Sequence, residues 1–178
     1  HDLSLMYGGG MVVEVDLERA YALNEQACQT RWLPACSDQG RMLAAGQGTA
    51  LDPLRGVKLV LDTCLDGYAK ACIVVGELAQ QHGATKEAER LFGLGCEAGL
   101  YKACLGKSQI LYSDYRVLEA AMALEVSCEK GDARGCVEAG ALILGTDMPA
   151  LRPYDAEAHT LLHKGCELGD ARGCQMLA

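Results

Sequence analysis

Small and apolar residues return at fixed positions along this chain, in step with its cysteines. The ten cysteines form five pairs, and the two members of each pair are eight residues apart. The pairs are Cys28 and Cys36, Cys64 and Cys72, Cys96 and Cys104, Cys128 and Cys136, and Cys166 and Cys174. Their first members are 36, 32, 32 and 38 residues apart, a period typical of solenoids built from helical hairpins.

Two positions relative to each cysteine pair are occupied only by alanine or glycine. Eight residues before the first cysteine stand Ala20, Gly56, Ala88, Ala120 and Ala158. Immediately before the second cysteine stand Ala35, Ala71, Ala103, Gly135 and Gly173. Aromatic residues make up only 5% of the chain, and this composition favours close helix-on-helix packing over a sandwich or a barrel.

A further small residue, followed three positions later by a mostly larger apolar one, marks a second helix in each repeat. The pairs are Gly40 with Leu43, Gly76 with Ala79, Ser108 with Leu111, and Gly140 with Ile143, and Ser4 with Tyr7 also fits. A glycine inside a helix costs about 1 kcal/mol relative to alanine. Its recurrence at the same position of successive repeats therefore predicts that a neighbouring helix crosses closely there.

The turn between the two helices is predicted from the third residue after the first cysteine. Glycine occupies this position in four of the five repeats, as Gly67, Gly99, Gly131 and Gly169, and Arg31 is the exception. Glycine suits the left-handed conformation that ends many helices. The first cysteine then lies in the last turn of one helix, called helix B, and the second opens the next, called helix A. Because the two thiols meet across the turn, we predict five local disulfides.

Segments rich in helix breakers separate helix A from helix B. They cover residues 44–53, 80–85, 112–115 and 145–155, and we also expect Gly8, Gly9 and Gly10 to form a loop at a helix end. We predict one repeat domain over residues 1–178, with repeats at about 1–34 (partial), 35–70, 71–102, 103–134 and 135–172, and a truncated repeat from 173 to 178. Because both ends fall inside a helix A, the chain is expected to be a fragment of a longer repeat protein.

The sequence resembles the Sel1-like repeat family in the segments ACSDQGRMLAAGQG, residues 35–48, and CLDGYAKAC, residues 64–72. The eight-residue cysteine spacing is similar to that of its cysteine-rich branch, the Helicobacter cysteine-rich proteins. The resemblance implies an all-α, right-handed superhelix of helix pairs, related to tetratricopeptide repeats and generally used for protein interaction. Asp16 and Asp52 stand where the family marks the start of helix B, whereas Ala84, Arg116 and Tyr154 depart from its pattern.

The cysteines leave two other readings open. A zinc site would need thiolates in C-x2-C pairs, and the chain has none, while a reduced cytosolic array would keep free thiols. Ten cysteines are typical of exported proteins, so we expect a periplasmic or extracellular location, with the mitochondrial intermembrane space as the alternative. Closing a nine-residue loop contributes roughly 2.5 kcal/mol per bridge.

Charge and hydropathy exclude some partners. The net charge of -8 and the pI of about 5.0 argue against nucleic acid and anionic membranes, because phosphate binding needs a basic surface. No stretch approaches the roughly 18 consecutive apolar residues of a membrane span, so we expect no membrane insertion. Neutral or basic proteins remain as partners.

Two motifs could carry chemistry. Ser127 to Lys130 forms S-x-x-K, the serine acylase signature, but its companions S-D-N and K-T-G are absent and Cys128 is committed to a bridge. Lys130 is better explained as a cation at a helix C-terminus. We therefore predict no catalytic residue, and a β-lactam-binding or hydrolysing protein of the cysteine-rich branch is the alternative.

Histidines offer the second possible chemistry. His159 and His163 are four residues apart, and Glu167 follows four residues later, so the three could share a helix face. The segment lacks the H-E-x-x-H general base, and a chance polar stripe explains it better. His82 and His1 have no evident partner. We predict neither a metal nor a cofactor.

Positions five and eight after the second cysteine would project from one face of each helix A, which lines the concave side in superhelices of this kind. They are Arg41 and Ala44, Glu77 and Gln80, Gln109 and Tyr112, and Ala141 and Leu144. These positions vary where the structural ones are uniform. The sequence therefore favours a scaffold that binds a protein or peptide, with Arg41, Glu77, Gln80, Gln109 and Tyr112 as candidate contacts. An assembly factor in an oxidising compartment is a further alternative for the function. The simplest alternative for these residues is an ordinary helix face that contacts only solvent.

Overall fold

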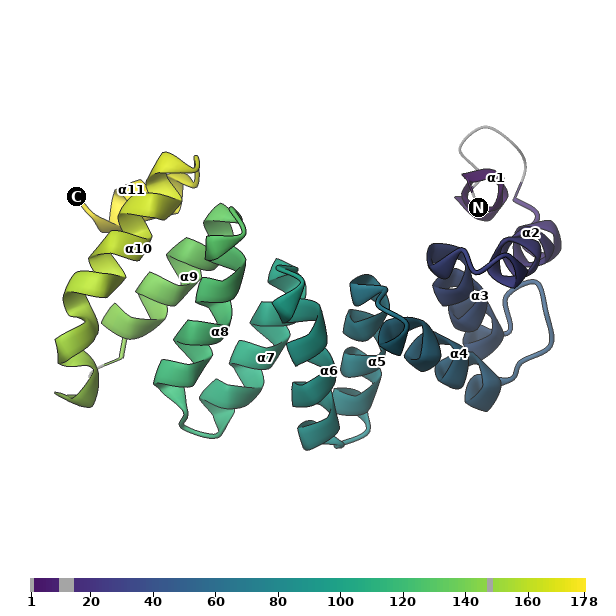
Figure 1. Ribbon diagram of the computed structural model, residues 1–178, viewed down its shortest axis with the longest axis horizontal. Helices are drawn as coiled ribbons and strands as arrows, with labels where there is room; N and C mark the ends of the chain where they lie inside the picture. The colour runs from purple at the N-terminus through teal and green to yellow at the C-terminus, as the bar shows by residue number, and fades with distance from the viewer. Residues whose placement is uncertain (1, 10–14, 147–148) are drawn as a thin grey trace. The chain divides into compact units, whose positions relative to one another are not determined.

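The structure, a computed structural model, describes residues 2–9, 15–146 and 149–178, and within these ranges it contains helices and turns but no strand (Figure 1). The α-helices are α1 (Asp2–Gly9), α2 (Leu17–Gln29), α3 (Leu33–Ala45), α4 (Pro53–Leu65), α5 (Ala69–Gln81), α6 (Thr85–Glu97), α7 (Tyr101–Ser113), α8 (Val117–Glu129), α9 (Ala133–Leu144), α10 (Asp155–Glu167) and α11 (Ala171–Met176). A 3-10 helix, η1 (Pro149–Tyr154), precedes α10. The predicted all-α repeat fold is confirmed.

The helices divide into two compact units, residues 1–75 and 76–178. In the first unit, α1 to α4 pack one after another, and in the second α6 to α11 do the same. Within the second unit the helices alternate between two layers. The A helices α7, α9 and α11 contact one another in sequence, and so do the B helices α6, α8 and α10. No helix in the described ranges is long and apolar enough to cross a membrane.

All five predicted disulfides are present, and each joins the last turn of a B helix to the first turn of the following A helix. They are Cys28–Cys36, Cys64–Cys72, Cys96–Cys104, Cys128–Cys136 and Cys166–Cys174, with Cα–Cα distances of 4.5 to 4.8 Å. Each A helix starts three residues before its cysteine, slightly earlier than predicted. Every bridge therefore fastens one repeat to the next.

The turn position that usually holds glycine has a left-handed backbone in all five repeats. The glycines have φ values of 102° (Gly67), 80° (Gly99), 90° (Gly131) and 95° (Gly169). Arg31 adopts the same region with φ of 62°, although it has a side chain. The backbone requirement of the turn is thus uniform even where the residue is not.

The B helices begin where the repeat register predicts, whether or not a capping side chain is present. Asp16 and Asp52 cap α2 and α4 by accepting from the backbone N–H groups of Arg19 and Arg55, at 2.9 and 3.1 Å. The three departures from the family pattern, Ala84, Arg116 and Tyr154, occupy the same N-cap position without a side-chain bond. Packing and the bridges therefore fix these starts.

Close helix crossings explain the small residues inside the A helices. A Cβ on Gly40 would lie 2.8 Å from the carbonyl oxygen of Gly56 on α4. A Cβ on Gly140 would lie 2.7 Å from the carbonyl oxygen of Ala158 on α10. Real Cβ atoms do not come this close to backbone, so the predicted close crossings are confirmed.

Two expectations about loops were wrong. Gly8 and Gly9 lie inside α1 rather than in a loop, and Gly10 falls outside the described residues. The breaker-rich segment 145–155 contains η1, because Leu151, only 6% exposed, packs into the core with Val117 and Leu161. Residues 147 and 148 of that segment lie outside the described ranges.

Candidate functional site

An open hollow of about 390 Å³ lies between the A helices α7 and α9. Its lining residues are Leu105, Ser108, Gln109 and Tyr112 of α7, Leu124 of α8, and Glu138, Ala141 and Leu142 of α9. We call this hollow, defined by those eight residues, the A-groove. Three of the varied positions singled out from the sequence, Gln109, Tyr112 and Ala141, meet here.

Helical spacing explains how α7 and α9 present these side chains together. The four α7 residues stand at intervals of three, one and three, and the three α9 residues at intervals of three and one, so each set follows one helix face. Leu124 is 2% exposed and supplies apolar surface from the B layer. Tyr112 is 50% exposed, and Gln109 is also exposed. The A-groove thus has an apolar interior and an aromatic and polar margin.

Charged residues surround the α9 side of the A-groove. Glu138 accepts a hydrogen bond at its Oε1 from the Nη1 of Arg172 on α11, at 2.7 Å. The guanidinium of Arg134 lies over the ring of Tyr101, 4.4 Å from its centre. Burial raises the pKa of the Tyr101 hydroxyl, and the nearby carboxylate of Glu138 raises it further. These contacts link α7, α9 and α11 and hold the Glu138 carboxylate in place.

The other candidate contacts are exposed but lie outside the A-groove. Arg41 on α3 is 3.5 Å from the carboxylate of Asp38. Glu77 on α5 is 3.7 Å from the ammonium of Lys102, and Gln80 is also exposed. The remaining members of the series, Ala44 and Leu144, are half-buried. The predicted series is therefore exposed at its polar positions, and part of it gathers at one hollow.

Two further hollows lie between B helices and have a different chemistry. One of about 330 Å³ in the first unit is lined by charged residues of α2 and α4, and one of about 300 Å³ in the second unit lies between α6 and α8. The lining of the first includes Glu25, Arg55, Lys58 and Asp62, and that of the second includes Glu89, Lys107, Arg116 and Glu119. In the second, Arg116 is held by Glu89 and Glu119, so its guanidinium and these two carboxylates are already paired.

Ser127 and Lys130 of the S-x-x-K tetrad have separate structural roles. Ser127 is fully buried, and its hydroxyl donates to the carbonyl oxygen of Leu124 at 2.8 Å. Lys130 is exposed at the C-cap of α8, and its methylene groups lie against Gly99. A nucleophile must reach its substrate, and this hydroxyl faces the packed interface with Gly135.

The histidine stripe on α10 is exposed. The Nδ1 of His159 is 2.7 Å from the carbonyl oxygen of Asp155, and His163 and Glu167 are also at the surface. Among the described residues, no three potential ligands are grouped around a possible metal position. His82 is exposed in the turn after α5, and His1 lies outside the described residues.

Sequence reasoning missed Leu105, Leu124, Leu142 and Glu138 as lining residues of the A-groove. Leu105 and Leu142 follow the second cysteine by one and six residues, positions to which the repeat pattern assigned no role. Glu138 could have been noticed as a lone carboxylate in the apolar segment CVEAGALIL, although nothing in the sequence pairs it with Arg172.

Comparison with solved structures identifies the fold. The chain is similar to a Sel1 repeat protein from Oxalobacter formigenes, with a TM-score of 0.70 and 20% identity over 97% of this chain and 73% of that one. It is also similar to c5321, a protective antigen of uropathogenic Escherichia coli strains that displays an SLR fold, with a TM-score of 0.68 and 19% identity. That match covers 97% of this chain and 38% of c5321.

The protein is therefore an all-α repeat protein with the Sel1-like repeat (SLR) fold. No model of a known protein family matches the sequence, and no curated protein matches it. Five disulfides are typical of proteins that fold in an oxidising compartment.

Proposed function

We propose that this protein is a non-enzymatic scaffold that binds another protein or a peptide on its helix A face, in the periplasm or outside the cell. The A-groove carries the proposal, because it is an open, largely apolar hollow at which residues of the varied series meet. Exposed apolar surface with an aromatic margin is common where proteins bind one another. The SLR fold supports the same role, since the family it resembles generally mediates protein interaction.

Catalysis through Ser127 is the weaker alternative, because its hydroxyl is buried and already bonded. Turnover of a chromogenic β-lactam that disappears in Ser127→Ala would restore it. Absence of turnover in the wild type is the result that we expect.

Site-specific photo-crosslinking tests the proposed function. A photoreactive phenylalanine analogue replaces Tyr112 at the A-groove, and the matched control replaces Met122, which is 55% exposed on the B helix α8. Both proteins are irradiated with the exported proteins of the host. We expect a discrete adduct from position 112 that is absent from position 122. Equal adducts at both positions, or none at 112, would contradict the proposal.

A further inference from the structure

The lining of the A-groove indicates which chemistry a bound segment carries, and this inference rests on the function proposed above. Most of the lining is apolar: Leu105, Leu124, Ala141 and Leu142 are aliphatic, and Tyr112 presents a ring. Ser108 is only 4% exposed and offers little to a ligand. The polar groups within reach of a bound segment are therefore the hydroxyl of Tyr112, the amide of Gln109 and the carboxylate of Glu138.

Glu138 is the one charged residue among the eight that line the A-groove, and it has spare hydrogen-bonding capacity. Its Oε1 accepts from Arg172, but its Oε2 has no partner among the residues that the structure describes. A carboxylate can accept about four hydrogen bonds. Arg172 therefore fixes the position of this carboxylate and leaves one of its oxygens available for a second cation.

We propose that the A-groove binds a segment of a partner protein in which an aliphatic side chain stands next to a lysine or arginine. The aliphatic side chain packs among the leucines, and the cation pairs with Oε2 of Glu138. The exposed amide of Gln109 offers both a donor and an acceptor to the backbone of the segment. The net charge of -8 favours the approach of a basic segment, whereas an acidic segment would bring a second carboxylate beside Glu138.

Amide chemical shifts of the ¹⁵N-labelled protein test this chemistry. The probes are two capped hexapeptides, acetyl-Ala-Ala-Leu-Lys-Ala-Ala-amide and the same peptide with glutamate in place of lysine. We expect both to shift resonances of Leu105, Tyr112 and Leu142, with the lysine peptide binding about threefold more tightly, as one partly exposed ion pair allows. Glu138→Gln should remove this preference. Glu87→Gln, which removes an exposed, arginine-paired carboxylate on the B helix α6 and outside the candidate contacts, should preserve it.

Two results would overturn the inference. The first is an equal or tighter fit of the glutamate peptide, and the second is shifts that map away from the A-groove. In either case an adduct at Tyr112 would show that the helix A face still binds a partner, so that only the chemistry assigned to the segment fails. Loss of the Tyr112 adduct would remove the proposed function itself. Glu138 is partly exposed, so we expect Glu138→Gln to fold. Retained dispersion of its amide resonances checks this.

Discussion

The turn between α2 and α3 and the turn between α8 and α9 share a backbone conformation and a bridge but differ at both central residues. The first has Arg31 and Trp32, where the second has Gly131 and Asp132. Gly131 adopts its φ of 90° without strain, whereas Arg31 holds a φ of 62° despite its side chain. This conformation costs a residue with a Cβ about 1–2 kcal/mol.

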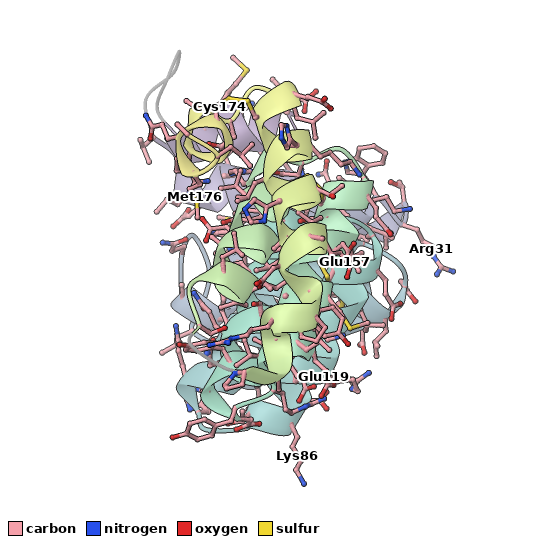
Figure 2. All side chains as sticks on the ribbon, turned by 90° about the vertical axis from the view of Figure 1, so that its left-hand side faces the viewer. Arg31, Lys86, Glu119, Glu157, Cys174 and Met176 are labelled. Carbon is pink, nitrogen blue, oxygen red and sulfur yellow. A yellow bond between two sulfur atoms is a disulfide. The ribbon has the colours of Figure 1, made fainter. Side chains whose placement is uncertain are left out.

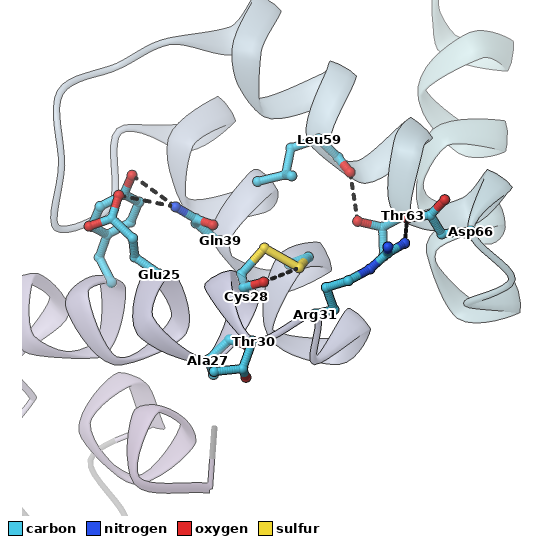
Figure 3. The surroundings of a disulfide bond; sticks show 11 residues. Glu25, Ala27, Cys28, Thr30, Arg31, Gln39, Leu59, Thr63 and Asp66 are labelled. Atoms are coloured by element: carbon cyan, nitrogen blue, oxygen red, sulfur yellow. Dashed lines mark hydrogen bonds and ion pairs between the residues drawn. A yellow bond between two sulfur atoms is a disulfide. The ribbon is translucent and has the colours of Figure 1, made fainter.

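The contacts of the Arg31 side chain offset little of this conformational cost. It projects away from the ribbon in Figure 2, and its Nη2 lies 3.4 Å from Oδ2 of Asp66, an ion pair that Figure 3 draws. The two side chains are 82% and 51% exposed. Exposed ion pairs contribute about 0–1 kcal/mol. The comparison teaches that the bridge and the helix packing hold the turn, and that the residue in it is free to vary at a modest cost.

The neighbouring residues differ in the same way. Asp132 caps α9 by accepting from the backbone N–H of Arg134 at 3.0 Å and also binds its guanidinium. Trp32 occupies the N-cap of α3 without any side-chain cap bond and is 54% exposed. The turn between α8 and α9 is therefore built from residues that favour a turn. The turn between α2 and α3 is held by its bridge and by the packing of the helices around it.

Removing the bridge from each turn should have the largest effect. The double variant Cys128→Ala/Cys136→Ala loses roughly 2.5 kcal/mol of loop-closure stabilisation and about 1 kcal/mol of packing, because both cysteines are fully buried. Cys28→Ala/Cys36→Ala should lose the same loop-closure contribution but less packing, since Cys36 is buried and Cys28 is only half-buried. Urea unfolding measures both. A larger loss from Cys28→Ala/Cys36→Ala would contradict this ranking by burial and would show that the turn with Arg31 depends more on its bridge.

Glycines that permit a helix crossing should tolerate substitution less well than glycines with free space. Gly140→Ala places a Cβ against the Ala158 carbonyl and should cost about 1–3 kcal/mol. The control is Gly93→Ala in α6, where the nearest such atom is the Lys107 Nζ at 3.9 Å. It should gain up to about 1 kcal/mol from helix propensity. Thermal unfolding that destabilised both alike would argue against close crossing as the cause.

Exchanging the two turn residues tests the strain directly. Arg31→Gly should stabilise the protein by about 1 kcal/mol, and Gly131→Arg should destabilise it by a similar amount. A Cβ on Gly131 would meet nothing within 4 Å, so space does not explain the second effect. Differential scanning calorimetry gives both shifts. An unchanged midpoint for Arg31→Gly would mean that the arginine carries more of the fold than its contacts show.

Substituting the N-cap residue of each turn, Asp132 or Trp32, should give the smallest difference in stability between the two turns and the one that depends most on pH. Hydrogen bonding to Arg134 lowers the pKa of Asp132. Its stabilisation is therefore fully present above the unfolded pKa of about 3.9 and is lost as the pH falls through the lower folded value. Asp132→Ala should cost about 1 kcal/mol at pH 7 and progressively less below pH 4. Trp32→Ala should change the stability by no more than about 0.5 kcal/mol at either pH.

The cysteine spacing predicted most of the fold. A disulfide between cysteines eight residues apart locates the end of one helix, the turn after it and the start of the next helix. Even the B helices without a capping side chain, such as the one that begins after Ala84, start in register. The 3-10 helix at Pro149–Tyr154 was not predicted, since it depends on the burial of Leu151 among distant residues.

The candidate site was only partly predictable. Gln109 and Tyr112 stood out because they vary within a uniform repeat. The inward positions of Leu105 and Leu142 and the pairing of Glu138 with Arg172 depend on how neighbouring repeats pack, and a repeat pattern does not contain that information.

Disulfide mapping tests the central structural claim most directly, namely that each repeat is fastened to the next across its own turn. The protein is isolated from an oxidising compartment, its free thiols are blocked, and a non-reducing digest is analysed by mass spectrometry. The account predicts five linked pairs, each joining cysteines eight residues apart, and no blocked thiol. Bridges between different turns, or a blocked thiol at any of the ten cysteines, would contradict it.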